Sequence, residues 1–280
     1  MWSPDGPKIV TTCDDKFTRV WGSSGGSPLL TLAGHINLVY TAVFSPDGTK
    51  IATSSDDNTV RVWNSASGAS LLVLTGHTDY VRTVAWSPDG SKLLTASYDR
   101  KAIIWNSNTG SAMVTMTGHT TFLVQAAWSP DGTKVATASG DDTARVWNSS
   151  SGAEFVSQRL TGHNGDVNSV AWSPDGTKIA TGSSDFTAKI WSSSSGAPLL
   201  TLAGHTNYVR SVTWSPDGTR IATSGDDNTA KLWSSSGGAA LMTIGPNPHT
   251  DWAYWVSFSP DGSQVATASY DRTARIWNAV

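Results

Sequence analysis

The sequence predicts an all-β protein with the fold of a seven-bladed β-propeller. Seven copies of the turn Ser-Pro-Asp-Gly recur 42 or 44 residues apart, beginning at Ser3, Ser45, Ser87, Ser129, Ser173, Ser215 and Ser259. Between these turns, short stretches of Val, Ile, Ala and Trp are punctuated by Gly, Ser, Thr and Asp, which is a strand pattern. No long run has apolar residues at helical spacing. A repeat of this length is typical of propellers built from four-stranded blades.

The third repeat shows how each blade is expected to form. Strands are predicted over residues 71–74, 80–86, 92–97 and 101–105. A Gly-His loop joins the first two strands, and the Ser-Pro-Asp-Gly turn joins the second and third. Pro presets φ at the second turn position and Gly tolerates positive φ at the fourth, so a tight hairpin is expected. The other repeats keep this order, with insertions at residues 154–160 and 245–248 that are expected to alter one rim and leave the blade core intact.

The two ends of the chain predict incomplete blades within a single domain spanning residues 1–280. Trp2 aligns with Trp86 at the end of a strand, so the strand and Gly-His loop before it are absent, and the last repeat ends at Val280 after its Trp strand. Four-stranded antiparallel blades are therefore expected, with the first and last blades each missing a strand. About 18 residues are missing by comparison with the repeat. N-terminal truncation is the favoured explanation, and association with a second chain through open edges comes second. Closure of the ring with two three-stranded blades is the third.

Composition excludes several kinds of partner. The net charge is −3 and no run of Lys or Arg exceeds two residues, so a nucleic-acid partner is not expected. No apolar run approaches membrane-spanning length and no segment resembles a signal peptide, so neither a membrane partner nor secretion is expected, and the cytoplasm is the default location. The single cysteine, Cys13, cannot form an internal disulfide.

The motifs within the repeat resemble those of the WD-repeat β-propeller family. The repeat carries a Gly-His pair, a Ser-x-Asp motif, and a Trp six residues beyond the Asp, with the hairpin turn between. The resemblance covers essentially the whole chain. One departure is consistent, since the Trp is never followed by Asp, but that residue lies at a strand end. The resemblance implies a propeller that binds other proteins.

Ser, His and Asp recur together, which raises the hypothesis of a hydrolase. The sets are His35, Ser55, Asp57, Trp63; His77, Ser97, Asp99, Trp105; His119, Ser139, Asp141, Trp147; His163, Ser183, Asp185, Trp191; and His249, Ser269, Asp271, Trp277. Gly225 replaces the Ser in the repeat of His205, and Cys13 replaces it in the first repeat. A catalytic site needs one asymmetric constellation, so near-identical sets favour a scaffold role and no catalytic residue is expected. The family resemblance implies a hydrogen-bonded chain from the Trp indole through Ser and His to Asp.

Metals and other cofactors are not expected either. Paired acids such as Asp56-Asp57 offer two carboxylates, whereas calcium takes six to eight oxygen ligands. Six histidines spread over six blades cannot converge on zinc.

The variable loop positions predict where a partner binds. Five of the six residues that lie three positions after a His are apolar or aromatic, and Asp166 is the exception. The resemblance places this loop on the top face, where partners of the family dock, and large side chains on a rigid platform suit a protein-binding hot spot. The predicted partner-binding residues are Leu38, Tyr80, Phe122, Tyr208, Trp252, Arg82, Arg210 and Tyr254, with Tyr40, Trp255, Tyr98, Arg100, Phe186, Tyr270 and Arg272 as nearby candidates.

The sequence therefore favours a non-enzymatic scaffold that binds a protein or peptide on an aromatic-rimmed top face. An alternative is a structural subunit that associates through open blade edges, including self-association at the seam. The near-uniform repeats also allow a recently amplified or consensus-like repeat protein without a selected partner. An enzyme would need one blade with an odd cluster of acids or histidines, and the sequence contains none.

Overall fold

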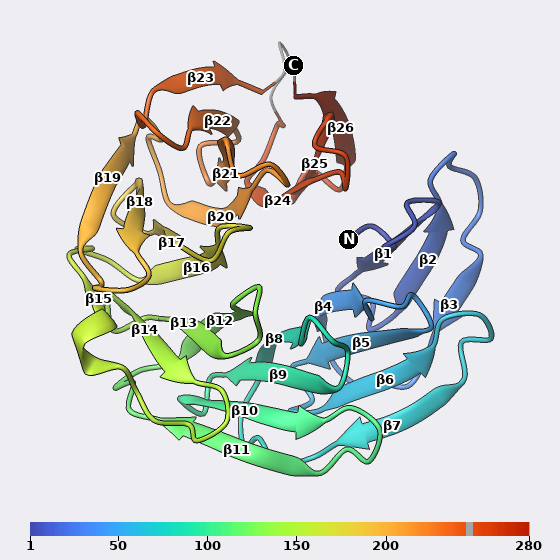
Figure 1. The fold of residues 1–280 in the computed structure, drawn as a ribbon. Coiled ribbons are helices and arrows are strands. Elements are labelled where there is room, and N and C mark those ends of the chain that lie inside the picture. The colour runs from blue at the N-terminus through green and yellow to red at the C-terminus, as the bar shows by residue number, and fades with distance from the viewer. Residues whose placement is uncertain (245–248, 280) are drawn as a thin grey trace. The chain divides into compact units, whose positions relative to one another are not determined.

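The computed structural model describes residues 1–244 and 249–279 (Figure 1). The described residues form seven antiparallel sheets, of which five have four strands and the first and last have three. This confirms the predicted all-β, seven-bladed β-propeller with a strand missing from its first and last blades. The predicted insertion at residues 245–248 lies outside the described residues.

The chain divides into two compact units, Met1–Val135 with Trp147–Ala153, and Ala136–Val146 with Glu154–Val280. Three sheets lie wholly in the first unit. They are formed by β1 (Lys8–Thr12), β2 (Thr18–Gly22) and β3 (Leu30–Leu32); by β4 (Val39–Phe44), β5 (Lys50–Ser55), β6 (Val60–Asn64) and β7 (Ser70–Leu74); and by β8 (Val81–Trp86), β9 (Lys92–Ser97), β10 (Lys101–Asn106) and β11 (Ala112–Thr117).

Three more sheets lie wholly in the second unit. They are formed by β16 (Val167–Trp172), β17 (Lys178–Ser183), β18 (Thr187–Ser192) and β19 (Pro198–Ala203); by β20 (Val209–Trp214), β21 (Arg220–Gly225), β22 (Ala230–Ser234) and β23 (Ala240–Thr243); and by β24 (Ala253–Phe258), β25 (Gln264–Ser269) and β26 (Ala274–Asn278). The fourth sheet consists of β12 (Leu123–Trp128), β13 (Lys134–Ser139), β14 (Thr143–Asn148) and β15 (Leu160–Thr161), and its residues are divided between the units.

The sequence repeat and the sheet are out of step by one strand. β7 opens the third sequence repeat, but it pairs with β6 and completes the second sheet. The same offset holds for β11 and β19. Each complete sheet therefore takes its fourth strand from the repeat that follows.

The core lies between neighbouring sheets of each unit. In the first unit, Val62 of β6 and Leu74 of β7 pack with Val81, Val84 and Leu93 of the next sheet. In the second unit, Ile190 and Leu202 pack in the same way with Val209, Val212 and Ile221. Strands buried on both faces explain the continuous runs of apolar and small residues in the sequence.

The Ser-Pro-Asp-Gly turn holds itself together by side-chain hydrogen bonds. The Ser87 hydroxyl donates to the Asp89 carboxylate at 2.6 Å and accepts the Lys92 backbone N–H at 2.9 Å. Gly90 has a φ of 71°, which an L side chain would adopt only with strain. The Trp86 indole, just before this turn, donates to the Val43 carbonyl oxygen of the neighbouring sheet at 3.3 Å.

The insertion at residues 154–160 alters the fourth strand of its sheet as well as the loop before that strand. A 3₁₀ helix, η1 (Val156–Gln158), precedes β15, which is only two residues long. Glu154, just before this helix, forms ion pairs with Arg145 at 3.1 Å and with Arg159 at 2.8 Å. Leu160 remains 1% exposed, so the core position of this strand is kept, as expected.

We expect substitution in the core between sheets to destabilise the protein far more than substitution on an outer strand. Leu94 is fully buried, whereas Leu71 is 46% exposed. Leu94→Ala should lower the free energy of unfolding by about 2–5 kcal/mol, because it leaves a cavity. Leu71→Ala should change it by about 0.5 kcal/mol or less. Urea unfolding followed by tryptophan fluorescence compares the two variants, and equal losses would contradict this description of the core.

Candidate functional site

A buried His–Asp pair joins two loops at one end of five sheets, and we call this end of every sheet the His-loop face. His77 lies in the loop before β8, and its Nδ1 is 2.8 Å from Asp99 Oδ2 in the turn between β9 and β10. The same carboxylate oxygen accepts the backbone N–H of Thr78. Equivalent pairs with distances of 2.7–2.8 Å are His35–Asp57, His163–Asp185, His205–Asp227 and His249–Asp271. The pair therefore fixes the His loop against the strand turn within one sheet.

The hydroxyl that contacts both the His ring and the Trp indole belongs to a threonine, and not to the serine that the sequence predicts. Thr95 Oγ1 lies 2.7 Å from His77 Nε2 and accepts the Trp105 indole N–H at 2.9 Å. The Ser97 hydroxyl instead donates to the Asp79 carbonyl oxygen and accepts the Asp99 backbone N–H. Ser183 and Ser269 make the corresponding contacts with Gly165 and Asp251.

Strand geometry explains this correction. Trp105 pairs with Leu93 and Ile103 pairs with Thr95, so the side chains of Trp105 and Thr95 are diagonal neighbours on one face. Ser97 is four residues from Leu93 along the strand, about 13 Å, which is beyond the reach of the indole.

The sixth and first sheets show that the serine is dispensable to the network. Gly225 occupies the serine position of the sixth sheet, yet Thr223 still contacts His205 and the Trp233 indole. In the first sheet Thr11 accepts the Trp21 indole N–H, and Cys13 is a free, exposed thiol. A Thr stands two residues before the Ser, Gly or Cys in all seven repeats, and that regularity is the signal that could have identified it.

In the fourth sheet the His, Trp, Ser and Asp of the repeat occupy the same positions. The His119 ring lies 6.0 Å from the Trp147 ring, and the Ser139 hydroxyl accepts the Asp141 backbone N–H at 3.2 Å.

The chemistry of the groups sets the direction of the hydrogen bonds. An ionised carboxylate can only accept, so His77 Nδ1 donates to Asp99. The Thr95 oxygen accepts the indole N–H and lies within hydrogen-bond distance of His77 Nε2. Burial lowers the pKa of the His163 imidazole, which keeps that ring neutral. The hydroxyl and both ring nitrogens of the network therefore already have hydrogen-bond partners, and the network holds the His loop and the strand turn in place.

The carboxylates of the network have lowered pKa values. Burial of Asp99 favours the neutral form, but hydrogen bonds from His77 and from the backbone N–H groups of Thr78 and Lys101 outweigh it. The pKa of Asp99 therefore lies below its ordinary value. The shift has the same direction for Asp57, Asp185, Asp227 and Asp271.

The predicted partner-binding residues of the first unit form what we call the first aromatic cluster, Tyr40, Tyr80, Arg82, Tyr98 and Phe122. The Arg82 guanidinium lies over the Tyr40 ring at 3.7 Å and 5.7 Å from the Tyr98 ring. Tyr98 in turn contacts Tyr80 at 5.8 Å and Phe122 at 4.7 Å between ring centroids. Leu38 is half-buried on its His loop, and its carbonyl oxygen accepts the Asp56 backbone N–H.

The predicted residues of the second unit form the second aromatic cluster, Phe186, Tyr208, Arg210, Trp252, Tyr254 and Tyr270. The Arg210 guanidinium lies 5.2 Å from the Tyr208 ring and 5.8 Å from the Trp252 ring. The carboxylate of Asp226, in the same sheet, accepts hydrogen bonds from Arg210 Nε at 2.8 Å and from Arg210 Nη2 at 2.5 Å. Phe186 contacts Tyr208 at 5.7 Å, and Tyr270 contacts Trp252 at 5.5 Å and Tyr254 at 5.7 Å.

Four rings of the second aromatic cluster remain accessible. Tyr208, Trp252, Phe186 and Tyr270 are 40, 43, 43 and 54% exposed. Asp166, which stands where other repeats have an apolar residue, is joined to the turn that carries Phe186 through a backbone hydrogen bond with Ser184. Burial, followed by the nearby charge of Asp142, raises the pKa of Asp166.

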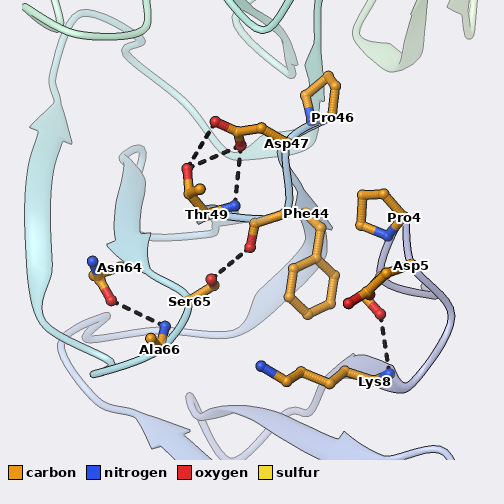
Figure 2. A pocket seen from close by; sticks show the side chains of 12 residues that line it. Pro4, Asp5, Lys8, Phe44, Pro46, Asp47, Thr49, Asn64, Ser65 and Ala66 are labelled. Atoms are coloured by element: carbon orange, nitrogen blue, oxygen red, sulfur yellow. Dashed lines mark hydrogen bonds between the residues drawn. The ribbon is translucent and has the colours of Figure 1, made fainter.

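A pocket at the opposite, Ser-Pro-Asp-Gly end of the first unit brings together no catalytic set (Figure 2). Phe44 stands where the next sheet has Trp86, and Ala66 stands where the next loop has Asn108, whose side chain holds Lys50 at 2.9 Å. The smaller residues leave space beside Lys8. The pocket contains no His or Cys, and its Asp47 carboxylate is occupied by Ser45 and Thr49. Within residues 1–244 and 249–279, no group of three His, Cys, Asp or Glu side chains is placed to hold a metal ion.

Comparison with protein-family models identifies seven matches to the WD domain, G-beta repeat. They cover residues 1–22, 26–64, 68–106, 110–148, 155–192, 196–234 and 241–278. Comparison with curated proteins finds no match. No helix in the described part of the chain is long and apolar enough to span a membrane.

We expect the threonine of the network to contribute more stability than the serine that the sequence suggested. Thr95→Val leaves the Trp105 indole N–H and the His77 Nε2 without partners in a buried site and should cost about 1–3 kcal/mol. Ser97→Ala should cost about 1 kcal/mol. Urea unfolding at pH 7 measures both, and a larger loss for Ser97→Ala would contradict the assignment.

We also expect the His–Asp pair to contribute to acid sensitivity. Because the folded pKa of Asp99 lies below the ordinary value of 3.8, its stabilisation is complete above that pH and is lost as the pH falls towards the folded pKa. Asp99→Asn should lower stability at pH 6, and the stabilities of the two proteins should converge as the pH falls below 3.8. Urea midpoints across this range test the sign, and parallel curves would contradict it.

Proposed function

The chain belongs to the WD-repeat β-propeller family, and we propose that it is a non-enzymatic scaffold that binds a protein or peptide on its His-loop face. Propellers of this family are in general protein-interaction scaffolds. The observation that carries the proposal is the second aromatic cluster, where four exposed rings are held in one continuous chain of contacts around Arg210.

Rigid aromatic side chains suit this role for a physical reason. A ring that is already held by its neighbours loses little conformational entropy on binding, so most of the area that it buries contributes to affinity. Arg210 is fixed by Asp226 and stacked between Tyr208 and Trp252, which orders the rings before any partner arrives. Tyr254 belongs to the same cluster through its contact with Tyr270. In the first unit, Tyr80, Arg82 and Phe122 of the first aromatic cluster, together with Leu38, occupy the His-loop face and are proposed to bind in the same way.

The charges of this face favour a protein or peptide over nucleic acid or a membrane surface. Arg210 is neutralised by Asp226, and Asp166 adds a carboxylate on a His loop whose backbone is bonded to the turn that carries Phe186. The proposal includes a partner segment with apolar or aromatic residues and a basic residue placed towards Asp166. It also places the protein in the cytoplasm, since its fold depends on no disulfide.

A structural subunit that associates through blade edges is the second candidate. The observation that favours it is the three-stranded first and last sheets, because unpaired strand edges recruit other chains. Its test is the light-scattering mass across a range of protein concentrations, where self-association would appear as a mass that rises with concentration.

We expect peptides selected from a displayed library of random linear sequences to depend on the second aromatic cluster. Trp252→Ala should weaken the binding of such a peptide by about thirtyfold or more, equivalent to about 2 kcal/mol, because a large anchor ring is lost. Leu199→Ala is the matched control, since Leu199 is also exposed but lies on β19, away from the His loop. Isothermal titration of each variant measures the effect.

Two outcomes would count against the top-face proposal. Equal weakening by Trp252→Ala and Leu199→Ala would place the peptide elsewhere. A library that yields no binder would favour the view that the repeats were amplified without a selected partner.

A further inference from the structure

The pocket beside Lys8 has the size and the lining of a small-molecule site. Its volume is about 640 Å³, within the range of sites that bind small organic molecules (Figure 2). Phe44 and Ser65 form its buried part, since they are 8 and 6% exposed. Pro4 and Pro46 form part of its exposed rim. A ligand can therefore enter past the two prolines and cover the Phe44 ring.

The next repeat shows which groups fill the equivalent space. Trp86 stands at the position of Phe44, and its indole donates to a backbone carbonyl oxygen of the neighbouring sheet. Asn108 stands at the position of Ala66, and its Oδ1 accepts a hydrogen bond from the Lys50 ammonium at 2.9 Å. The pocket therefore lacks two groups that the next repeat supplies, a larger aromatic ring system and an oxygen acceptor for a lysine.

Lys8 is the counterpart of Lys50, but its ammonium has no such acceptor. Among residues 1–244 and 249–279, no group accepts a hydrogen bond from Lys8 Nζ. Figure 2 shows the Lys8 side chain extending into the pocket, with its ammonium on the side of Asn64 and Ala66. A ligand with an oxygen at this place would supply the acceptor that Ala66 lacks.

The carboxylates of the pocket limit the negative charge that a ligand can carry. Asp47 accepts hydrogen bonds from the Ser45 hydroxyl and the Thr49 backbone N–H, and these hold its pKa below the ordinary value. Asp5 also lines the pocket. A single carboxylate can pair with Lys8, whereas the two charges of a phosphate would be repelled by both aspartates.

We propose that this pocket binds a small aromatic carboxylate, with the ring against Phe44 and the two prolines and the carboxylate on the Lys8 ammonium. Burial of the ring supplies most of the affinity, and the charged hydrogen bond fixes its orientation. A ligand of this size with one such contact should bind with a Kd of about 1 mM. The site lies at the end of the sheets opposite the His-loop face and does not depend on the partner proposed there.

Two probe compounds test the proposal on the unchanged protein. The first is a fluorinated indoleacetate, and the second is the same fluorinated ring with a methyl group in place of the carboxylate arm. Each is titrated with the full chain, and binding is followed by fluorine NMR. We expect the carboxylate to bind about tenfold more tightly than the methyl compound, because only the carboxylate pairs with Lys8. Inorganic phosphate should not displace it.

Variants that restore the side chains of the next repeat locate the site. Ala66→Asn gives Lys8 an internal acceptor and Phe44→Trp fills the ring space, so each should weaken binding of the carboxylate by about tenfold or more. Both new side chains already occur at the equivalent positions of the next repeat, and urea unfolding checks that the variants are folded. Lys8→Gln should reduce the affinity for the carboxylate to that for the methyl compound.

Asn108→Ala is the matched control. It removes the acceptor of Lys50 but leaves the Trp86 indole in place, so it should neither weaken binding nor create a second site. The proposal would be overturned by equal binding of the two compounds, by the absence of saturable binding, or by displacement with inorganic phosphate. It would also be overturned by full binding to Ala66→Asn and Phe44→Trp, or by loss of binding in Trp252→Ala, which would place the ligand on the His-loop face.

Discussion

The buried carboxylate that joins the His loop to the strand turn is the contact on which the proposed binding face depends. Asp99 receives hydrogen bonds from a histidine ring and from backbone N–H groups of both segments, so one side chain fixes the relative position of two loops. The histidine is held in turn by Thr95 and, through it, by the Trp105 indole deep in the sheet. A fully satisfied buried network of this kind resists small rearrangements, because each broken bond would leave a polar group unpaired.

The variable residues stand directly beside this fixed framework. Tyr208 follows His205 by three positions, and Tyr98 and Asp226 immediately precede the carboxylates of their turns. Their backbone positions are therefore set by the network, while their side chains differ from sheet to sheet. This separation lets the side chains of the His-loop face differ without altering the hydrogen bonds that hold the loops.

Much of this could be predicted from the sequence, and the failures have physical causes. The turn spacing identified the sheets, and the recurrence of His77 and Asp99 at fixed positions identified a paired set. Thr95 was missed because threonine is common in strands and the serine lay in a more conspicuous motif, although the distance of Ser97 from Leu93 along the strand excludes contact with the indole. Which rings touch Arg82 or Arg210 depends on side-chain directions across neighbouring sheets, which no spacing along the chain specifies. The pocket beside Lys8 forms because Phe44 and Ala66, on two different elements, are both smaller than their counterparts in the next sheet, and neither residue alone predicts it.

The offset between repeat and sheet gives the protein two independent kinds of surface. The His-loop face is built within a repeat, since His77, Thr95, Asp99 and Trp105 all belong to one repeat and one sheet. The outer edge is built between repeats, because β7 completes a sheet whose other strands precede it in the sequence. Trp252 and Leu71 therefore lie on different parts of the repeat, one on a loop fixed by side chains and the other on an outer strand. A substitution on the loop leaves the strand pairing unchanged, and a substitution on the outer strand leaves the His–Asp network unchanged, because no side chain of that network comes from the outer strand.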